Sequence, residues 1–295
     1  MSSIPEKEHP ELTPFLANLF SVIYTSSYVG ILYLSHLTRP QPGLARDTPF
    51  VIRARIRAVT VVTIIALINS ALVTYFYSPH KTYLDVAAFL GIYVKLPLTL
   101  DILRCLLLTT TLFLGPLVRR LWLEDGLGEL RGDVGIMFTT WIGWRNYVAG
   151  PFTEEVVFRA CMVPLHLLAG RSPGTIVFIS PLFFGIAHIH HAYEFYINTD
   201  NPNRIVVMII RSLFQFTYTT LFGWFATFVF LRTGSVWACI VTHSFCNFMG
   251  VPDFGPVDGP RWRSVVCYTL LVTGALGFYK LLWPLTESQH ALVNF

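Results

Sequence analysis

The 295-residue sequence contains few charged residues: only 13% are Asp, Glu, Lys or Arg, whereas 54% are hydrophobic. A soluble domain carries about 25% charged residues, so this deficit excludes an ordinary soluble enzyme and predicts a polytopic membrane protein. The net charge is +4, and the basic residues lie mostly in short loops. This pattern fits contact with anionic lipid headgroups, so we expect the lipid bilayer as a partner and no nucleic acid.

Cysteine is also scarce, and its pattern excludes two kinds of stabilised fold. The five cysteines lie in apolar stretches, their number is odd, and no two of them form a CxxC motif. A disulfide framework or a zinc knuckle is therefore not expected, and most of the cysteines should be small buried residues. The HExxH motif of zinc proteases is absent as well. These residues thus give no motif for a zinc site or for another cofactor.

Apolar stretches recur along the chain, and a membrane-spanning helix needs about 20 such residues. They predict an all-α fold, a polytopic transmembrane bundle of about eight membrane helices. Five arginines lie between the first two stretches (14–37 and 58–77) and mark that loop as cytosolic. Residues 119–133 are rich in charge and contain glycine, which predicts a loop.

We treat residues 1–295 as a single integral membrane domain with three parts. Residues 1–133 read as N-terminal scaffold helices. From residue 134 to 255 the apolar segments are shorter and contain polar residues, which predicts a polar-lined catalytic core. Residues 256–295 complete the chain with a C-terminal helix and a polar tail.

Two adjacent carboxylates and an arginine lie inside one of the core stretches: Glu154, Glu155 and Arg159. Ionisable groups at hydrocarbon depth cost about 2.5–3.5 kcal/mol each on insertion scales, so they indicate a functional site. Glu155 and Arg159 face each other at i, i+4, whereas Glu154 is rotated by about 100°. We therefore expect Arg159 to neutralise Glu155 and to leave Glu154 available as a base. Pro151 is expected in the first turn, which places the carboxylates near the positive helix end; an ordinary ion pair at a solvated helix start explains the spacing equally well.

Two further segments carry histidine or asparagine. His188 ends an apolar helix and precedes His190 and His191, a cluster that suits a metal site, a base or an interfacial cap. His243 and Asn247 project from one helix face, and both can donate hydrogen bonds. Fixed donors in a low-dielectric pocket suit an oxyanion hole, although hydrogen bonding between membrane helices uses the same residues. Together, a free carboxylate, a histidine and two donors describe a peptidase without a serine, cysteine or metal nucleophile.

These segments resemble the type II CaaX prenyl endopeptidases, or Ras-converting enzymes, a eukaryotic branch of the membrane glutamate peptidases. The family pattern is Glu-Glu-x-x-x-Arg, then Phe-x-x-x-His, then His-x-x-x-Asn. In this sequence the three motifs read Glu154-Glu155…Arg159, Phe184…His188 and His243…Asn247. Their flanking residues match as well, and the resemblance is strong over residues 134–255.

The resemblance implies an intramembrane hydrolase that removes the last three residues of prenylated Cys-a-a-X proteins, after the prenyl-cysteine. It implies farnesylated or geranylgeranylated partners such as Ras-type small GTPases, an endoplasmic reticulum membrane and an active site reached from the cytosol. By position, Glu154 and His188 would activate the attacking water. His243 and Asn247 would form the oxyanion hole. Glu155 and Arg159 would support them, without a metal.

Three other functions use the same polar residues. A non-catalytic membrane scaffold would keep the fold without turnover. A proton-coupled transporter would use Glu154 and His188 as a relay, and would tolerate a change at Asn247. A zinc peptidase would lose activity to chelators and recover it with added zinc.

Overall fold

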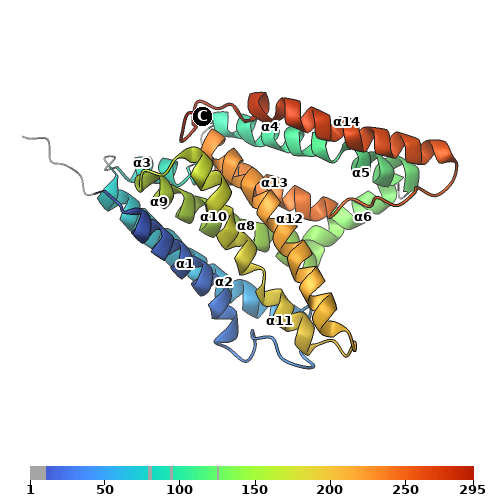
Figure 1. Ribbon diagram of the computed structural model, residues 1–295, viewed down its shortest axis with the longest axis horizontal. Helices are drawn as coiled ribbons and strands as arrows, with labels where there is room; N and C mark the ends of the chain where they lie inside the picture. The colour runs from blue at the N-terminus through green and yellow to red at the C-terminus, as the bar shows by residue number, and fades with distance from the viewer. Residues whose placement is uncertain (1–10, 79–81, 94–95, 125) are drawn as a thin grey trace, which may run out of the picture.

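The computed structural model describes residues 11–78, 82–93, 96–124 and 126–295 (Figure 1). Within these residues the chain forms helices and no strands, which confirms the all-α prediction. The α-helices are α1 (Pro14–Gly30), α2 (Pro49–Tyr77), α3 (Tyr83–Phe89), α4 (Leu96–Leu112), α5 (Leu114–Val118), α6 (Gly126–Thr139), α7 (Trp141–Trp144), α8 (Gly150–Glu155), α9 (Met162–Leu168), α10 (Pro173–Ala187), α11 (His190–Ile197), α12 (Arg204–Thr233), α13 (Val236–Met249) and α14 (Arg261–Thr286).

Several helices are long and apolar enough to cross a membrane. Among the described residues there are five: Pro14–Tyr33, Pro49–Tyr77, Pro173–Ile197, Arg204–Thr233 and Arg261–Thr286. A sixth candidate is a pair of segments, Thr99–Leu112 and Leu114–Leu123, bent by 77° at their junction. The chain is therefore a multi-pass membrane protein with five or six candidate spans, and the predicted count of about eight is approximate. The count differs because α13 is too short to cross alone, and because residues 141–168 are divided among short helical segments instead of forming long spans.

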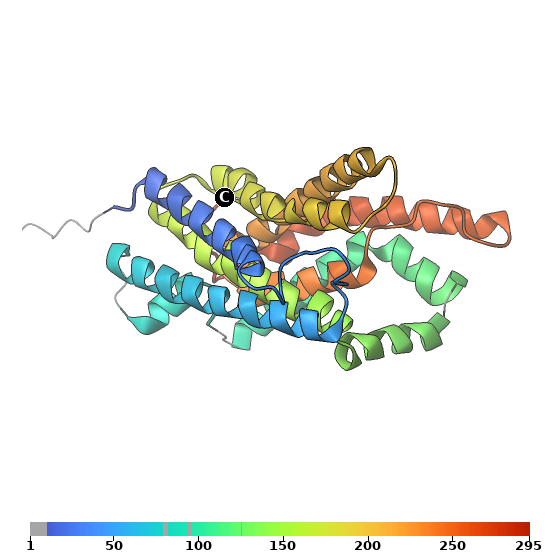
Figure 2. The same cartoon turned by 90° about the horizontal axis from the view of Figure 1, so that it is seen from below.

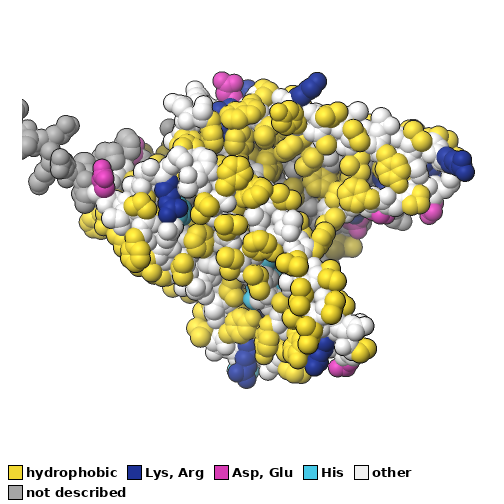
Figure 3. All heavy atoms as spheres, in the orientation of Figure 1, with side chains coloured by type: hydrophobic (Ala, Val, Ile, Leu, Met, Phe, Trp, Pro, Cys, Tyr) yellow, Lys and Arg dark blue, Asp and Glu magenta, His cyan; other side chains and the backbone are white. Residues whose placement is uncertain are grey.

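The surface agrees with a membrane environment. Hydrophobic side chains dominate the face seen in Figure 3, and most Lys and Arg side chains in that view lie near its rim. Large apolar residues on the long helices are more than half exposed, among them Ile65 on α2, Ile210 on α12 and Val265 on α14. A soluble protein rarely exposes so much apolar surface, so we assign these faces to lipid.

The buried core lies where the middle of the chain is surrounded by other helices. The segment Val156–Cys161 is buried at every residue, and α9 follows it directly. This region packs against α1 and α2 on one side and against α10 on another. In Figure 2 the same green segment lies along α1 and α2, drawn in blue. The polar core segment is thus enclosed by the first two helices and by α10.

Small residues allow some of these helices to approach closely. A Cβ added to Gly274 on α14 would lie 2.6 Å from the carbonyl oxygen of Thr111 on α4. Glycine at such a position lets two membrane helices pack backbone to backbone. The side-by-side arrangement of α4 and α14 in Figure 1 therefore depends on this residue.

Two predictions about loops are wrong. Residues 119–133 form a π-helical segment (Arg119–Glu124) and the first part of α6 instead of a charged loop. Helix α2 begins at Pro49 instead of residue 58, so Arg53, Arg55 and Arg57 belong to the helix and not to the preceding loop. Proline is favoured at the first helical position, and arginine has a high helix propensity. Charged residues alone therefore do not predict where these helices begin.

Candidate active site

The two glutamates lie in an irregular stretch of continuous helix. From Trp141 to Leu168 the chain stays helical, but π-helical segments at Arg145–Ala149 and Val156–Cys161 flank α8 on both sides. The prediction that Pro151 starts the helix is therefore wrong, because helical residues precede it. The glutamates do not lie at a positive helix end. Short π-helical segments are frequent at functional sites, since they change which side chains face inward.

The predicted ion pair between Glu155 and Arg159 is present. Arg159 Nε lies 3.1 Å from Glu155 Oε2, and Arg159 Nη1 donates to Oε1 at 3.2 Å. The residues are 0% and 1% exposed. The guanidinium also lies 4.7 Å from the Phe184 ring centroid and 5.7 Å from that of Phe222, and donates to the Gly223 carbonyl oxygen at 3.5 Å. A buried charge needs such partners because its desolvation is costly.

His243 connects the two glutamates. Its Nδ1 forms a 2.7 Å hydrogen bond with Glu155 Oε1, and its Nε2 lies 3.8 Å from Glu154 Oε2. An ionised carboxylate can only accept hydrogen bonds, so Nδ1 carries a proton in this contact. Nε2 is then the nitrogen that faces Glu154. The buried ion pair therefore fixes both the position and the orientation of the His243 ring.

Glu154 is the more accessible of the two carboxylates. Its side chain is 21% exposed, whereas that of Glu155 is 0% exposed. Gly150 leaves space beside it, because a Cβ on that glycine would lie 3.7 Å from Glu154 Oε1. The gap to His243 Nε2 exceeds a hydrogen bond, and a water can bridge polar groups at such separations. Glu154 therefore has the accessibility that a general base requires.

His188 and Asn247 border this cluster from two sides. His188 Nδ1 donates to the Phe184 carbonyl oxygen at 2.8 Å, which leaves Nε2 as the free ring nitrogen. The His188 ring is 4.6 Å from the Phe184 ring, which is itself 6.1 Å from the His243 ring. Asn247 donates from Nδ2 to the Asn146 carbonyl oxygen at 2.9 Å and is exposed to solvent.

The structure thus brings four of the six predicted residues into direct contact or within 4 Å of one another: Glu154, Glu155, Arg159 and His243. His188 adjoins them through Phe184. Asn247 lies one turn further along α13 and is held by the backbone of the π-helical segment that precedes α8.

The sequence did not identify some residues that shape the site. The Phe222 ring is 4.5 Å from the His243 ring; it lies in an aromatic-rich stretch in which nothing distinguishes it. Tyr28 pairs its hydroxyl with Thr153 Oγ1 at 2.9 Å, one residue before the glutamates. Tyr28 belongs to the first span, where no polar pattern indicated a role. Phe184 belongs to one of the motifs, but the sequence did not predict that its ring lies between the side chains of His188, His243 and Arg159.

The histidines after His188 belong to a different neighbourhood. The His190 and His191 rings are 3.9 Å apart, and His191 Nδ1 lies 3.8 Å from Glu194 Oε2. Within the part of the chain that the structure describes, no group of three or more His, Cys, Asp or Glu side chains could hold a metal ion. The cysteines in this part are free, and all but the half-buried Cys246 are buried, as expected.

Fold and site together define a multi-pass membrane protein with a buried carboxylate–histidine centre. The family described as Type II CAAX prenyl endopeptidase Rce1-like matches residues 136–249, which include every predicted site residue. A probable CAAX prenyl protease 2 of Schizosaccharomyces pombe is 37% identical over 273 residues, covering 92% of this chain and 94% of the relative.

Two further relatives are named CAAX prenyl protease 2. The Arabidopsis thaliana protein is 34% identical and covers 88% of this chain and 86% of its own length. The human protein is 35% identical, with 89% and 79% covered. No solved structure matches the chain. The chain therefore belongs to the family of type II CAAX prenyl endopeptidases, which are hydrolases.

Proposed function

We propose that this protein is an intramembrane endopeptidase that removes the last three residues of prenylated Cys-a-a-X proteins. It hydrolyses the peptide bond that follows the prenyl-cysteine. The observation that carries this proposal is the contact of one histidine with two unlike carboxylates: His243 is fixed by the buried Glu155 and faces the accessible Glu154. The names of the relatives support the substrate class.

In this mechanism Glu154 is the general base and His188 orients the water. The Glu154 carboxylate takes one proton of the water, while His188 Nε2 accepts a hydrogen bond from the other. The water oxygen forms a bond to the scissile carbonyl carbon, and the π electron pair moves to the carbonyl oxygen. The carbon–nitrogen bond then breaks, and the proton held by Glu154 passes to the leaving amine. The second proton of the water passes from the new carboxyl group to the released amine, so the products are a prenyl-cysteine carboxylate and a tripeptide with a protonated amino group.

The oxyanion of the tetrahedral intermediate is stabilised by His243 and Asn247. His243 Nδ1–H is already bound to Glu155, so donation from Nε2 requires the doubly protonated ring. In that state the cluster holds two carboxylates and two cations, with no net charge. Transfer of a proton to Glu154 removes one negative charge, and formation of the oxyanion adds one, so the net charge of the cluster stays at zero. Fixed donors need no reorganisation during the reaction, which is why they lower the barrier.

The membrane brings the substrate to this site. Each buried CH₂ of a prenyl chain contributes about 0.8 kcal/mol to partitioning, so a farnesyl or geranylgeranyl group holds its protein at the bilayer. Helix α12 exposes Leu213, Phe214 and Leu221, which supply an apolar wall for the prenyl chain. We place the reaction at the cytosolic side of the endoplasmic reticulum membrane, where Ras-type small GTPases are suitable substrates.

The experiment that tests this function follows the products. The full-length protein in vesicles is incubated with a farnesylated Cys-a-a-X peptide and, separately, with the same peptide lacking the prenyl group. We expect mass spectrometry to detect the released tripeptide and the farnesyl-cysteine product from the first peptide, and at most traces from the second. If neither peptide is cleaved, or if cleavage occurs at another bond, the proposed function is wrong.

A further inference from the structure

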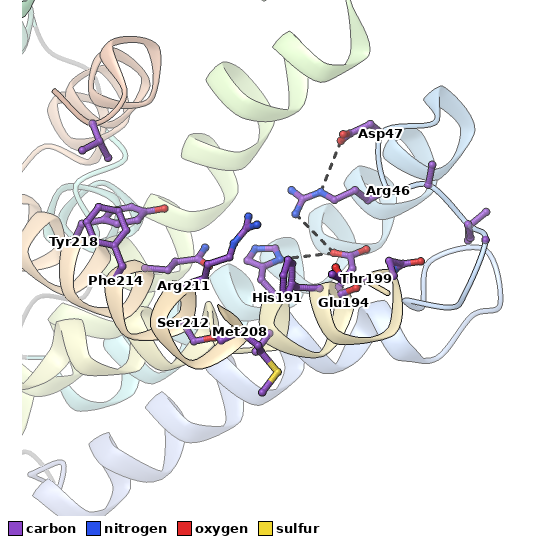
Figure 4. A pocket seen from close by; sticks show the side chains of 18 residues that line it. Arg46, Asp47, His191, Glu194, Thr199, Met208, Arg211, Ser212, Phe214 and Tyr218 are labelled. Carbon is purple, nitrogen blue, oxygen red and sulfur yellow. Dashed lines mark hydrogen bonds and ion pairs between the residues drawn. The ribbon is translucent and has the colours of Figure 1, made fainter. Parts of the chain in front are cut away.

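A cavity of about 770 Å³ lies beside the proposed catalytic groups (Figure 4). Pockets that bind small ligands measure about 300–1,000 Å³. Its walls come from the loop before α2, from α11 and from the first half of α12. One lining residue connects it to the proposed active site: the His191 ring lies 6.1 Å from the His188 ring.

The carboxylates of this cavity are already paired. Glu194, which is 5% exposed, accepts a hydrogen bond from Arg55 Nη2 at 2.7 Å. Asp47 accepts one from Arg145 Nη1 at 2.8 Å. Both donors approach from elements that do not line the cavity, α2 and the π-helical segment before α8. Each cavity carboxylate thus has its own arginine.

Two more arginines, Arg46 and Arg211, line the same cavity. Arg46 lies 3.7 Å from Asp47 and 3.8 Å from Glu194, both longer than a hydrogen bond. Arg211 is exposed, and its guanidinium lies 4.6 Å from the Phe195 ring centroid. Within the described residues no carboxylate forms an ion pair with Arg211. Four guanidinium groups therefore face two carboxylates, and the excess of two positive charges suits an anionic ligand.

Figure 4 shows that the Arg46 and Arg211 side chains extend into the space between α12 and the loop before α2. Planar guanidinium groups bind carboxylates with paired hydrogen bonds, and such charge-assisted bonds are about twice as strong as neutral ones. The cavity therefore has the chemistry of a carboxylate site.

The free carboxylate of a Cys-a-a-X substrate lies three residues beyond the scissile bond, and three residues of extended peptide span about 10–11 Å. The cavity adjoins the proposed active site where His191 meets His188, so it lies within reach of that carboxylate.

We infer that Arg211, with Arg46 opposite it, binds the free C-terminal carboxylate of the Cys-a-a-X substrate. This inference rests on the proposed endopeptidase function and adds a specificity-determining site to it.

The test compares two farnesylated tetrapeptides that differ only in a free carboxylate or a C-terminal amide. The full-length protein is assayed in vesicles of phosphatidylcholine alone, so that no anionic lipid competes. We expect kcat/KM for the acid to exceed that for the amide by about tenfold to a hundredfold, because one charge-assisted contact is lost. The Arg211→Gln variant should lose this preference by cleaving the acid more slowly, with the amide changed by less than about twofold.

Arg204→Gln is the matched control on the same helix. Its guanidinium lies 4.3 Å from the Tyr196 ring centroid and does not line the cavity, so the variant should keep the preference for the acid. Arg211→Lys should keep part of it. The ratio of kcat/KM for the acid to that for the amide is measured on the wild-type protein. It therefore tests the inference even if Arg211→Gln does not fold.

Two outcomes overturn the inference. One is equal cleavage of acid and amide by the wild-type protein, and the other is an equal loss on both peptides in Arg211→Gln. If added phosphatidylserine restores the preference for the acid in the Arg211→Gln variant, the cavity belongs to a lipid headgroup. That result overturns the inference as well. Failure to cleave either peptide refutes the proposed function itself and is thus distinguishable.

Discussion

The buried ion pair between Glu155 and Arg159 allows stability and catalysis to be separated by mutation. Replacing Arg159 with methionine leaves the Glu155 carboxylate, which is 0% exposed, with the His243 hydrogen bond as its remaining side-chain contact. Removing one member of a buried pair costs about 3–5 kcal/mol, because the other charge stays desolvated. Domains are stable by about 5–15 kcal/mol in total. We therefore expect Arg159→Met to lower the free energy of unfolding by about 3–5 kcal/mol and to abolish peptide cleavage.

The double variant Glu155→Leu/Arg159→Met removes both charges. Replacing a buried pair by apolar residues of similar volume is often neutral or stabilising. We expect its stability to return to within about 2 kcal/mol of the wild-type value, while cleavage stays lost because nothing orients His243. Unfolding in mixed detergent micelles, followed by far-UV circular dichroism, and cleavage of a farnesylated peptide measure the two quantities. An active double variant, or a single variant as stable as wild type, would refute the role given to this pair.

The remaining predictions concern the oxyanion donor, the helix contact and the metal. Asn247→Ala should lower kcat by about 10²–10³-fold with little change in KM, as expected for a donor to an oxyanion; an unchanged kcat, measured on the farnesylated peptide, excludes that role. Gly274→Val should destabilise the protein, because its Cβ would lie 2.6 Å from the Thr111 carbonyl oxygen; unfolding midpoints should fall, and the neighbouring exposed Val272→Ala serves as a control. Chelators such as EDTA and 1,10-phenanthroline should leave the cleavage rate unchanged, whereas inhibition reversed by zinc would identify a zinc peptidase.

Local spacing was sufficient to predict part of the site. The i, i+4 separation of Glu155 and Arg159 predicts their contact on any helix, and a 3.1 Å ion pair confirms it. The same periodicity turns Glu154 away, which agrees with its greater exposure. Composition and the length of the apolar stretches predict an all-α membrane protein. These predictions succeed because helix geometry alone determines them.

Contacts between distant segments were beyond the reach of such patterns. His243 meets Glu155 across 88 positions, and Asn247 meets the Asn146 carbonyl across 101. Neither distance follows from periodicity, because tertiary packing sets both. The prediction from Pro151 was wrong for a local reason: proline is favoured at the first helical position, whereas here π-helical segments flank the short helix that contains it. The sharp bend after Leu112 likewise changed the number of candidate spans.

The division of labour between the two glutamates is tested most directly by single-turnover cleavage in two isosteric variants. Glu154→Gln removes the base while its side chain keeps its shape, and should lower the rate by about 10²–10⁴-fold, the usual contribution of general base catalysis. A substrate-binding measurement should show that this variant still binds the farnesylated peptide. Glu155→Gln should destabilise the protein and lower the rate less. Wild-type cleavage by Glu154→Gln would contradict the assignment of Glu154 as the base.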